Sequence, residues 1–366
     1  MISHDGFNGR AVIEMVHNAI VCPLVTLETA KSRGELGTFD GGVYFPDGRI
    51  CDTGVQVKGR FRNVTAPLSI ADVKTKMAGK HIFGGLLHGW HFGHFVTESI
   101  ARLWAIRELE GDYESLVFYD RHLGRTPPNF AAAFIKSLGW HGPITIVAEP
   151  TQFELLAVPS QICDVPTGYA NGHPMVRRLF DPLKSQPLDG PEKIYVSRSK
   201  LGHSKGGFFL EENIEANLIA EGYEIVHPQE LSIAEQFRLY RSAKKIVAAE
   251  GSPVHLMSYA CEPDQDIFVI WRRGVHSIYL RLMESFGGPD IKNPSCIDRL
   301  IYPNDGSDYL KARSVIDFAK LRDLLVNRGF ISGERWSSPQ GDMLEAMVEK
   351  ALRPRGGMTF SQRAFR

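Results

Sequence analysis

Short apolar runs alternate with amphipathic runs of helix length over the second half of the chain, and no other sequence feature constrains the fold more. The apolar runs are rich in β-branched and aromatic side chains, which is typical of buried strands. Strands are expected at 193–197, 223–226, 245–249 and 267–270. Helices are expected near 211–220, near 233–243 and from Pro253 onward. Strands that alternate with helices form parallel sheets with right-handed crossovers, so the pattern predicts a doubly wound α/β domain.

A similar alternation occupies the first half of the chain. Strands are expected at 82–83, 116–119, 144–147 and 155–158, and helices from about His94 to Leu109 and at 129–138. The segment 43–51 predicts a hairpin, because its Asp-Gly pair suits a tight turn. A Pro/Gly/Asp-rich connector at 186–191 indicates a domain boundary. We therefore expect an N-terminal α/β domain (1–188), a C-terminal Rossmann-like domain (189–310), and trailing helices with a basic tail (311–366), for which packing back on the first domain is one option.

Two loops of the C-terminal domain carry groups that bind anions. The first, Arg198–Gly207, follows an expected strand and combines glycines with cationic side chains such as Lys205. The second holds Gly251, Ser252 and Pro253, and Ser-Pro is a typical helix start with Ser as the N-cap. Carboxyl ends of parallel strands share one edge, so together the loops favour a diphosphate site. Neither loop has Walker A or GxGxxG spacing, and a solvated loop beside an ordinary helix cap stays the alternative.

A cluster of histidines opens the first expected helix. His94 and Glu98 stand four residues apart, a spacing that places a base and its orienting partner on one helix face. His88 and His91 add two imidazoles, so a metal site must be considered, although no HExxH spacing is present. A core histidine that satisfies a backbone carbonyl is the third option.

Charge and cysteine content narrow the class of protein. Lys plus Arg and Asp plus Glu both number 42, so no global field would draw the chain onto nucleic acid. The five scattered cysteines lack a CxxC pair, which favours reduced thiols and a cytoplasmic location.

The apolar stretch 19–27 contains Pro23 and is too short to cross a bilayer, and no signal peptide is expected. The tail 353–366 has four arginines and is expected to be a solvated end, with peripheral contact to a membrane surface as the other option.

Four segments carry a family resemblance when they are taken in order and with their spacing. They are His91–Trp104, Tyr195–Arg198, Glu230–Gln236 and Ala249–His255. Over roughly 81–270 the chain resembles glycosyltransferase family 61, in particular its bacterial members in capsular or surface polysaccharide synthesis. The resemblance implies an α/β, GT-B-like fold with two Rossmann-like domains facing a cleft. It also implies inverting, metal-independent transfer of a hexosyl or pentosyl group from a nucleotide sugar to a glycan or glycolipid acceptor, without a cofactor.

The resemblance also assigns roles to individual residues. The catalytic candidates are His94, as first choice of base, and Glu98 as second. The donor-binding candidates are Arg198, Lys205, Gln236, Glu250, Gly251, Ser252 and His255, and no residue is assigned to a metal. Two other classes stay open: a catalytically inactive nucleotide-sugar-binding scaffold of a polysaccharide assembly complex, and a metal-dependent hydrolase built on the three histidines.

Overall fold

A computed structural model describes residues 10–26, 38–58, 61–64, 73–89, 91–119, 127–202, 205–274, 276–304, 311–354 and 359–365. The chain forms two compact units, 1–185 and 186–366. Mixed α/β structure with several sheets is present, as the sequence predicts. None of the described helices is long and apolar enough to cross a membrane. All five cysteines are free thiols.

The first unit is built on an eight-stranded mixed sheet in the order β3-β4-β2-β1-β8-β5-β6-β7. The strands are β1 (Ile13–Thr26), β2 (Thr38–Tyr44), β3 (Val57–Lys58), β4 (Phe61–Val64), β5 (Thr75–Leu86), β6 (Ser115–Tyr119), β7 (Ile144–Val147) and β8 (Thr151–Pro159). The last four are parallel and correspond to the strands predicted from the sequence. The expected α/β character is present in this unit, but the sheet is mixed and not wholly parallel, because β1 pairs antiparallel with both of its neighbours, β2 and β8.

The predicted hairpin of the first unit is present after β2. Cys51 N–H donates to the Val43 carbonyl at 2.8 Å, and Phe45 N–H donates to the Arg49 carbonyl at 2.7 Å. Gly48 has a φ of +84°, a left-handed conformation that glycine adopts without strain. The Asp-Gly pair therefore forms the tight turn of the hairpin, and this turn depends only on neighbouring residues.

The helix expected from His94 to Leu109 is broken into three segments. They are α2 (Phe92–His94), a π-helical turn (Phe95–Ser99) and a 3₁₀ segment (Leu103–Arg107). The Thr97 hydroxyl donates to the Gly93 carbonyl at 2.8 Å, a bond that competes with the regular helix ladder. Short helices α3 (Asn129–Ser137), α4 (Pro174–Arg178) and α5 (Asp181–Lys184) and a small ladder of β9 (Cys163–Asp164) with β10 (Tyr169–Ala170) complete the unit.

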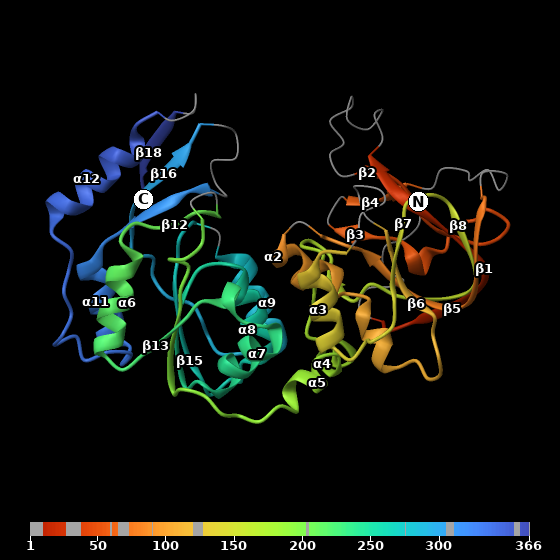
Figure 1. Cartoon of the computed structure of the whole chain (residues 1–366), viewed down its shortest axis with the longest axis horizontal. Coiled ribbons are helices and arrows are strands. Elements are labelled where there is room, and N and C mark those ends of the chain that lie inside the picture. The colour runs from red at the N-terminus through yellow and green to blue at the C-terminus, as the bar shows by residue number, and fades with distance from the viewer. Residues whose placement is uncertain are drawn as a thin grey trace. The chain divides into compact units, whose positions relative to one another are not determined.

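The second unit contains the predicted parallel sheet, in the order β13-β11-β14-β15 (Figure 1). Its strands are β11 (Lys193–Val196), β13 (Glu224–Val226), β14 (Lys245–Ala249) and β15 (Asp266–Ile270), joined or followed by α6 (Glu211–Ala220), α7 (Ile233–Ser242), α8 (Ser252–Ala260) and α9 (Ser277–Phe286). The chain passes from β11 outward to β13 and then returns to β14 on the other side of β11. This reversal is a topological switch point, and ligands of open α/β sheets bind beside such points.

A second four-stranded sheet of this unit was missed by the sequence analysis. It has the order β12-β17-β16-β18, with β12 (Gly207–Phe208), β16 (Ile297–Pro303), β17 (Arg313–Ile316) and β18 (Phe360–Ala364). The expectation of a solvated tail is therefore wrong for 360–364, which pair antiparallel with β16. The register Leu300↔Arg363 leaves that arginine exposed, so the basic side chain does not prevent strand pairing.

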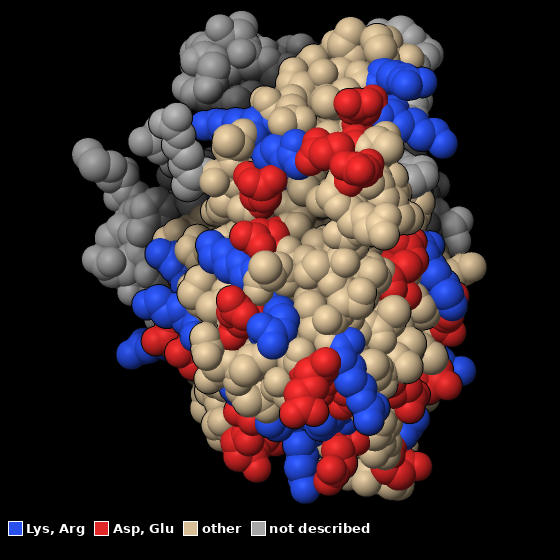
Figure 2. Space-filling model, turned by 90° about the vertical axis from the view of Figure 1, so that its left-hand side faces the viewer, with Lys and Arg blue, Asp and Glu red and all other residues tan. Residues whose placement is uncertain are grey.

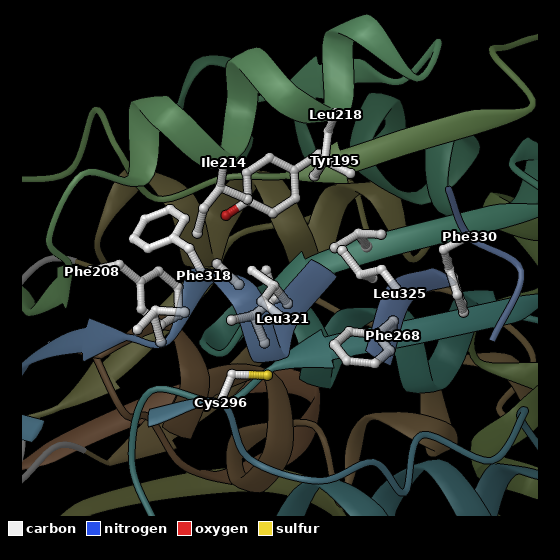
Figure 3. Close-up of a cluster of buried hydrophobic side chains, with 14 of the residues drawn as sticks. Tyr195, Phe208, Ile214, Leu218, Phe268, Cys296, Phe318, Leu321, Leu325 and Phe330 are labelled. Atoms are coloured by element: carbon white, nitrogen blue, oxygen red, sulfur yellow. The ribbon is translucent and has the colours of Figure 1, made fainter. Parts of the chain in front are cut away.

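The trailing helices α11 (Phe318–Asn327) and α12 (Gly341–Leu352) pack within the second unit. In Figure 3, Phe318, Leu321 and Leu325 of α11 lie in one buried cluster with Tyr195 of β11 and Phe268 of β15. The cluster covers one face of the parallel sheet and holds its carboxyl edge in place.

Charges on the surface are mixed. On the face drawn in Figure 2, Lys and Arg side chains lie interspersed with Asp and Glu side chains. Such a face has no single-sign field over its length. Positive charge that serves an anionic ligand must therefore be concentrated locally.

Candidate functional site

The two predicted anion-binding loops begin side by side at the carboxyl edge of the parallel sheet. Strands β11 and β14 are direct neighbours, with Val196 paired to Ala248. Helix α8 starts at Ser252 and has Gly251 as its N-cap, so the expectation that Ser252 is the cap is wrong by one position. The first turn of α8 contains no acidic residue. Its partial positive charge is thus not offset by a side chain of that turn.

Arg198 connects these two loops. Its side chain is buried, and its guanidinium lies so close to Gly251 that a methyl group there would overlap Nη1. Nη2 donates to the Lys205 carbonyl at 2.8 Å. Among the residues the structure describes, Nε of Arg198 is buried without a hydrogen-bond partner. A buried cation with an unsatisfied donor is costly, and an anionic ligand would remove that cost.

The first residue of helix α6 binds the start of the loop after β11. A buried carboxylate, Glu211, accepts hydrogen bonds from Tyr195 Oη at 3.0 Å, Ser197 Oγ at 3.1 Å and the backbone N–H of Arg198 at 2.7 Å. Leu210, which precedes α6, has a φ of +56°, a strained conformation for a branched side chain. The start of this loop, at Ser197 and Arg198, is therefore held by contacts that need no ligand.

A third loop on the same edge carries two arginines that the sequence analysis missed. Arg272 and Arg273 follow β15, and their backbone N–H groups donate to Glu250 Oε2 at 2.9 and 2.8 Å. Nε of Arg273 donates to Glu250 Oε1 at 2.7 Å. The pKa of Arg272 falls to about 10, because burial and the like charges of Arg273 and Arg198 outweigh the attraction of Glu250. The same strand-end rule that selected Arg198 would have found this pair.

Glu250 itself is fully buried, and its two carboxylate oxygens accept hydrogen bonds from Arg272 and Arg273. Replacing Glu250 with alanine would leave the Arg273 guanidinium and two loop amides without their acceptor, so we expect the free energy of unfolding to fall by about 3–5 kcal/mol. Urea denaturation of the full chain measures this change. The matched control is Glu345→Ala, which breaks an exposed pair with Arg299 and should change stability little. Equal losses for the two variants would show that Glu250 does not organise the loop.

The remaining donor-binding candidates differ in their surroundings. The His255 ring is buried and stacks on Tyr279 with centroids 4.4 Å apart. Lys205 is exposed, and it is its backbone carbonyl that contacts Arg198. Gln236 is buried and donates to the Pro228 carbonyl at 2.8 Å and the Leu231 carbonyl at 3.3 Å. The structure thus gathers Arg198, Gly251, Ser252 and Glu250, whereas the Gln236 amide is engaged in a turn.

The first unit brings its two catalytic candidates together. His94 Nδ1 lies 2.6 Å from Glu98 Oε1, on the α2 segment and the π-helical turn that follows it. The Glu98 side chain is only 3 % exposed, whereas that of His94 is 44 % exposed. π-Helical turns interrupt α-helices frequently at functional sites. One imidazole is therefore available to solvent while its carboxylate partner is enclosed.

The charge state of Glu98 determines what His94 can do. Burial opposes the ionised form of Glu98, but the neighbouring imidazoles of His88 and His94 and the charge of Lys58 outweigh it and hold the pKa of the carboxyl well below its ordinary value. A carboxylate can only accept, so Nδ1 of neutral His94 carries the hydrogen and Nε2 has the free lone pair. This geometry favours His94 over Glu98 as the base.

The histidine cluster does not form a metal site in the part of the chain that is described. No group of three or more His, Cys, Asp and Glu side chains among those residues could hold a metal ion. Instead, His91 Nδ1 accepts the backbone N–H of His94 at 3.4 Å and caps α2. The His88 and His94 rings lie side by side with centroids 5.5 Å apart.

A family model matches the middle of the chain. Residues 92–268 match the family model described as Glycosyltransferase 61. This range includes every catalytic and donor-binding candidate named from the sequence, but it excludes His88 and His91 of the histidine cluster, as well as Lys58, Arg272 and Arg273. No curated protein matches the chain.

Proposed function

We propose that this protein transfers a hexosyl or pentosyl group from a nucleotide sugar to a glycan or glycolipid acceptor, because residues 92–268 match the family model of glycosyltransferase family 61. The observation that carries the proposal is the position of Arg198 against Gly251 at the switch point of the parallel sheet. A guanidinium and a helix N-terminus at one point make a site for a diphosphate.

The donor's diphosphate is the group that this edge would hold. Three arginines, Arg198, Arg272 and Arg273, interact electrostatically around one buried carboxylate, Glu250. The surplus of positive charge would stabilise the negative charge that develops on the leaving diphosphate. We propose that these groups serve in place of a divalent cation, and that Glu250 acts through the loop it holds.

The chemical step is proposed as a single displacement. Nε2 of His94 takes the proton of the acceptor hydroxyl, and that oxygen attacks the anomeric carbon of the donor sugar. The bond between the anomeric carbon and the diphosphate oxygen breaks, and the nucleoside diphosphate leaves with the electron pair. One displacement inverts the configuration at the anomeric carbon.

The setting of the reaction is part of the proposal. We expect a GT-B-like arrangement, a cytoplasmic enzyme with peripheral contact to the inner face of the membrane, and a role in bacterial capsular or surface polysaccharide synthesis. The free cysteines are compatible with a reducing compartment.

A panel of nucleotide sugars, screened by thermal shift of the full chain in a chelator, tests this function. We expect one donor to raise the melting temperature because it binds only the folded state. That donor should then support transfer to a glycan acceptor in the same buffer. Donor binding without transfer to any acceptor would indicate the inactive scaffold instead. Stoichiometric metal in the purified protein, with activity lost in chelator, would favour the hydrolase.

A further inference from the structure

Three side chains that can carry positive charge converge on one buried carboxylate in the first unit. Lys58 Nζ lies 2.7 Å and His94 Nδ1 2.6 Å from Glu98 Oε1. His88 Nε2 lies 3.2 Å from the other oxygen, Oε2. Lys58 ends the two-residue strand β3, 40 positions before Glu98 in the chain. Both Lys58 and His88 are outside the region that the family model matches.

The need for these partners follows from burial. A carboxylate removed from water is strongly disfavoured unless cations or donors surround it. A protonated Glu98 could donate its own hydrogen to His94 Nδ1, and the imidazole would then carry its hydrogen on Nε2. In that tautomer Nε2 could not accept a proton. The charge of Glu98 therefore decides which nitrogen of His94 is basic.

We propose that Lys58 and His88 are positioning residues that hold Glu98 as a carboxylate, and so fix the hydrogen of His94 on Nδ1 and leave Nε2 as the proton acceptor. The inference rests on the proposed function for the role of Nε2 in transfer. Lys58 supplies the contribution that does not depend on a histidine being protonated, since an ammonium keeps its charge through neutral pH whereas an imidazole is ordinarily neutral there.

Other ionisable groups around the pair do not replace Lys58. His91 caps α2 through its own ring nitrogen. Cys163 of β9 lies within the electrostatic reach of Glu98, with Asp164 and Arg102 nearby. Burial raises the pKa of the Cys163 thiol to about 12, so this group is neutral around pH 7. Arg102 donates instead to the backbone carbonyls of Thr53 and Val55, both at 2.7 Å.

The first test is the pH dependence of kcat in Lys58→Met and Glu98→Gln. Removing the Lys58 cation leaves the Glu98 anion less compensated, which stabilises the protonated imidazole, so the acidic limb should move to higher pH by about half to one unit. Removing the Glu98 anion has the opposite sign, so the limb should move to lower pH and kcat should fall. Lys58→Arg should restore the wild-type profile. Lys76→Met, an exposed lysine of β5, is the matched control and should leave the profile unchanged.

The second test needs no turnover. In full-length protein labelled with ¹⁵N-histidine, nitrogen NMR distinguishes protonated from unprotonated ring nitrogens, and His94→Gln identifies the His94 signals. We expect an unprotonated Nε2 in neutral His94. A protonated Nε2, or a Lys58→Met titration identical to that of Lys76→Met, would overturn the inference. If the NMR result is as expected but no nucleotide sugar binds, the proposed function fails and the account of the His94 tautomer stands.

Discussion

Replacing His94 with alanine is expected to lower kcat by about 10²–10⁴ while the affinity for the nucleotide sugar is unchanged. The loss equals the usual contribution of a positioned general base, because alanine removes the nitrogen that takes the acceptor's proton. Folding should be preserved, since the His94 side chain is 44 % exposed and Glu98 keeps Lys58 and His88 as partners. Steady-state rates, with donor affinity measured separately by calorimetry, test both parts.

The control for this variant is another exposed histidine of the same unit. His141→Ala removes an imidazole in the segment before β7 and should leave kcat unchanged. Full activity of His94→Ala would reject His94 as the base. Loss of donor affinity in proportion to loss of rate would also contradict the assignment, because it would indicate disturbed structure or binding.

Replacing Gly251 with alanine is expected to weaken binding of the donor at least tenfold, or by about 1.4 kcal/mol, with little loss of stability. Gly251 has a φ of 168°, extended backbone that alanine also adopts, so no strain arises from the main chain. The added methyl would overlap Nη1 of Arg198, and the guanidinium is the end of a flexible side chain that can move away. The cation would then no longer lie over the start of α8.

Gly202→Ala is the matched control, because it adds the same methyl in the loop after β11, at a point where no contact within 4 Å is found among the described residues. Calorimetric titration with a nucleoside diphosphate compares the two variants, and thermal melts confirm that both are folded. We expect weak binding only for Gly251→Ala. Equal affinity for both variants would show that Arg198 need not occupy this position to bind the diphosphate.

The parallel sheet of the second unit was predictable because its strands are buried on both faces. The expected strands 245–249 and 267–270 agree with Lys245–Ala249 and Asp266–Ile270, within one residue. Strand β1 was missed because Pro23 interrupts its apolar pattern and Asn18 has a φ of +52° within it. Its main partner is β8, which pairs Ile13 with Pro159, and no local pattern reports so distant a contact.

The site was predictable only in part, and for a similar reason. Arg198 and Gly251 were found because each lies just past the end of a strand, two residues after Val196 and Ala249, and the two strands prove to be neighbours. Lys58 was not found, since a two-residue strand gives no periodic signal and its contact with Glu98 depends on tertiary structure. The N-cap was misplaced by one residue because Ser-Pro suits a helix start in either register.

The central claim is that the edge formed by the loops after β11 and β14 holds the donor's diphosphate. A crystal structure of the full chain with a nucleoside diphosphate tests it most directly. We expect phosphate oxygens at roughly 2.7–3.2 Å from the Arg198 guanidinium and from the backbone N–H of Ser252. Diphosphate bound elsewhere, with Arg198 making no contact to it, would contradict the account.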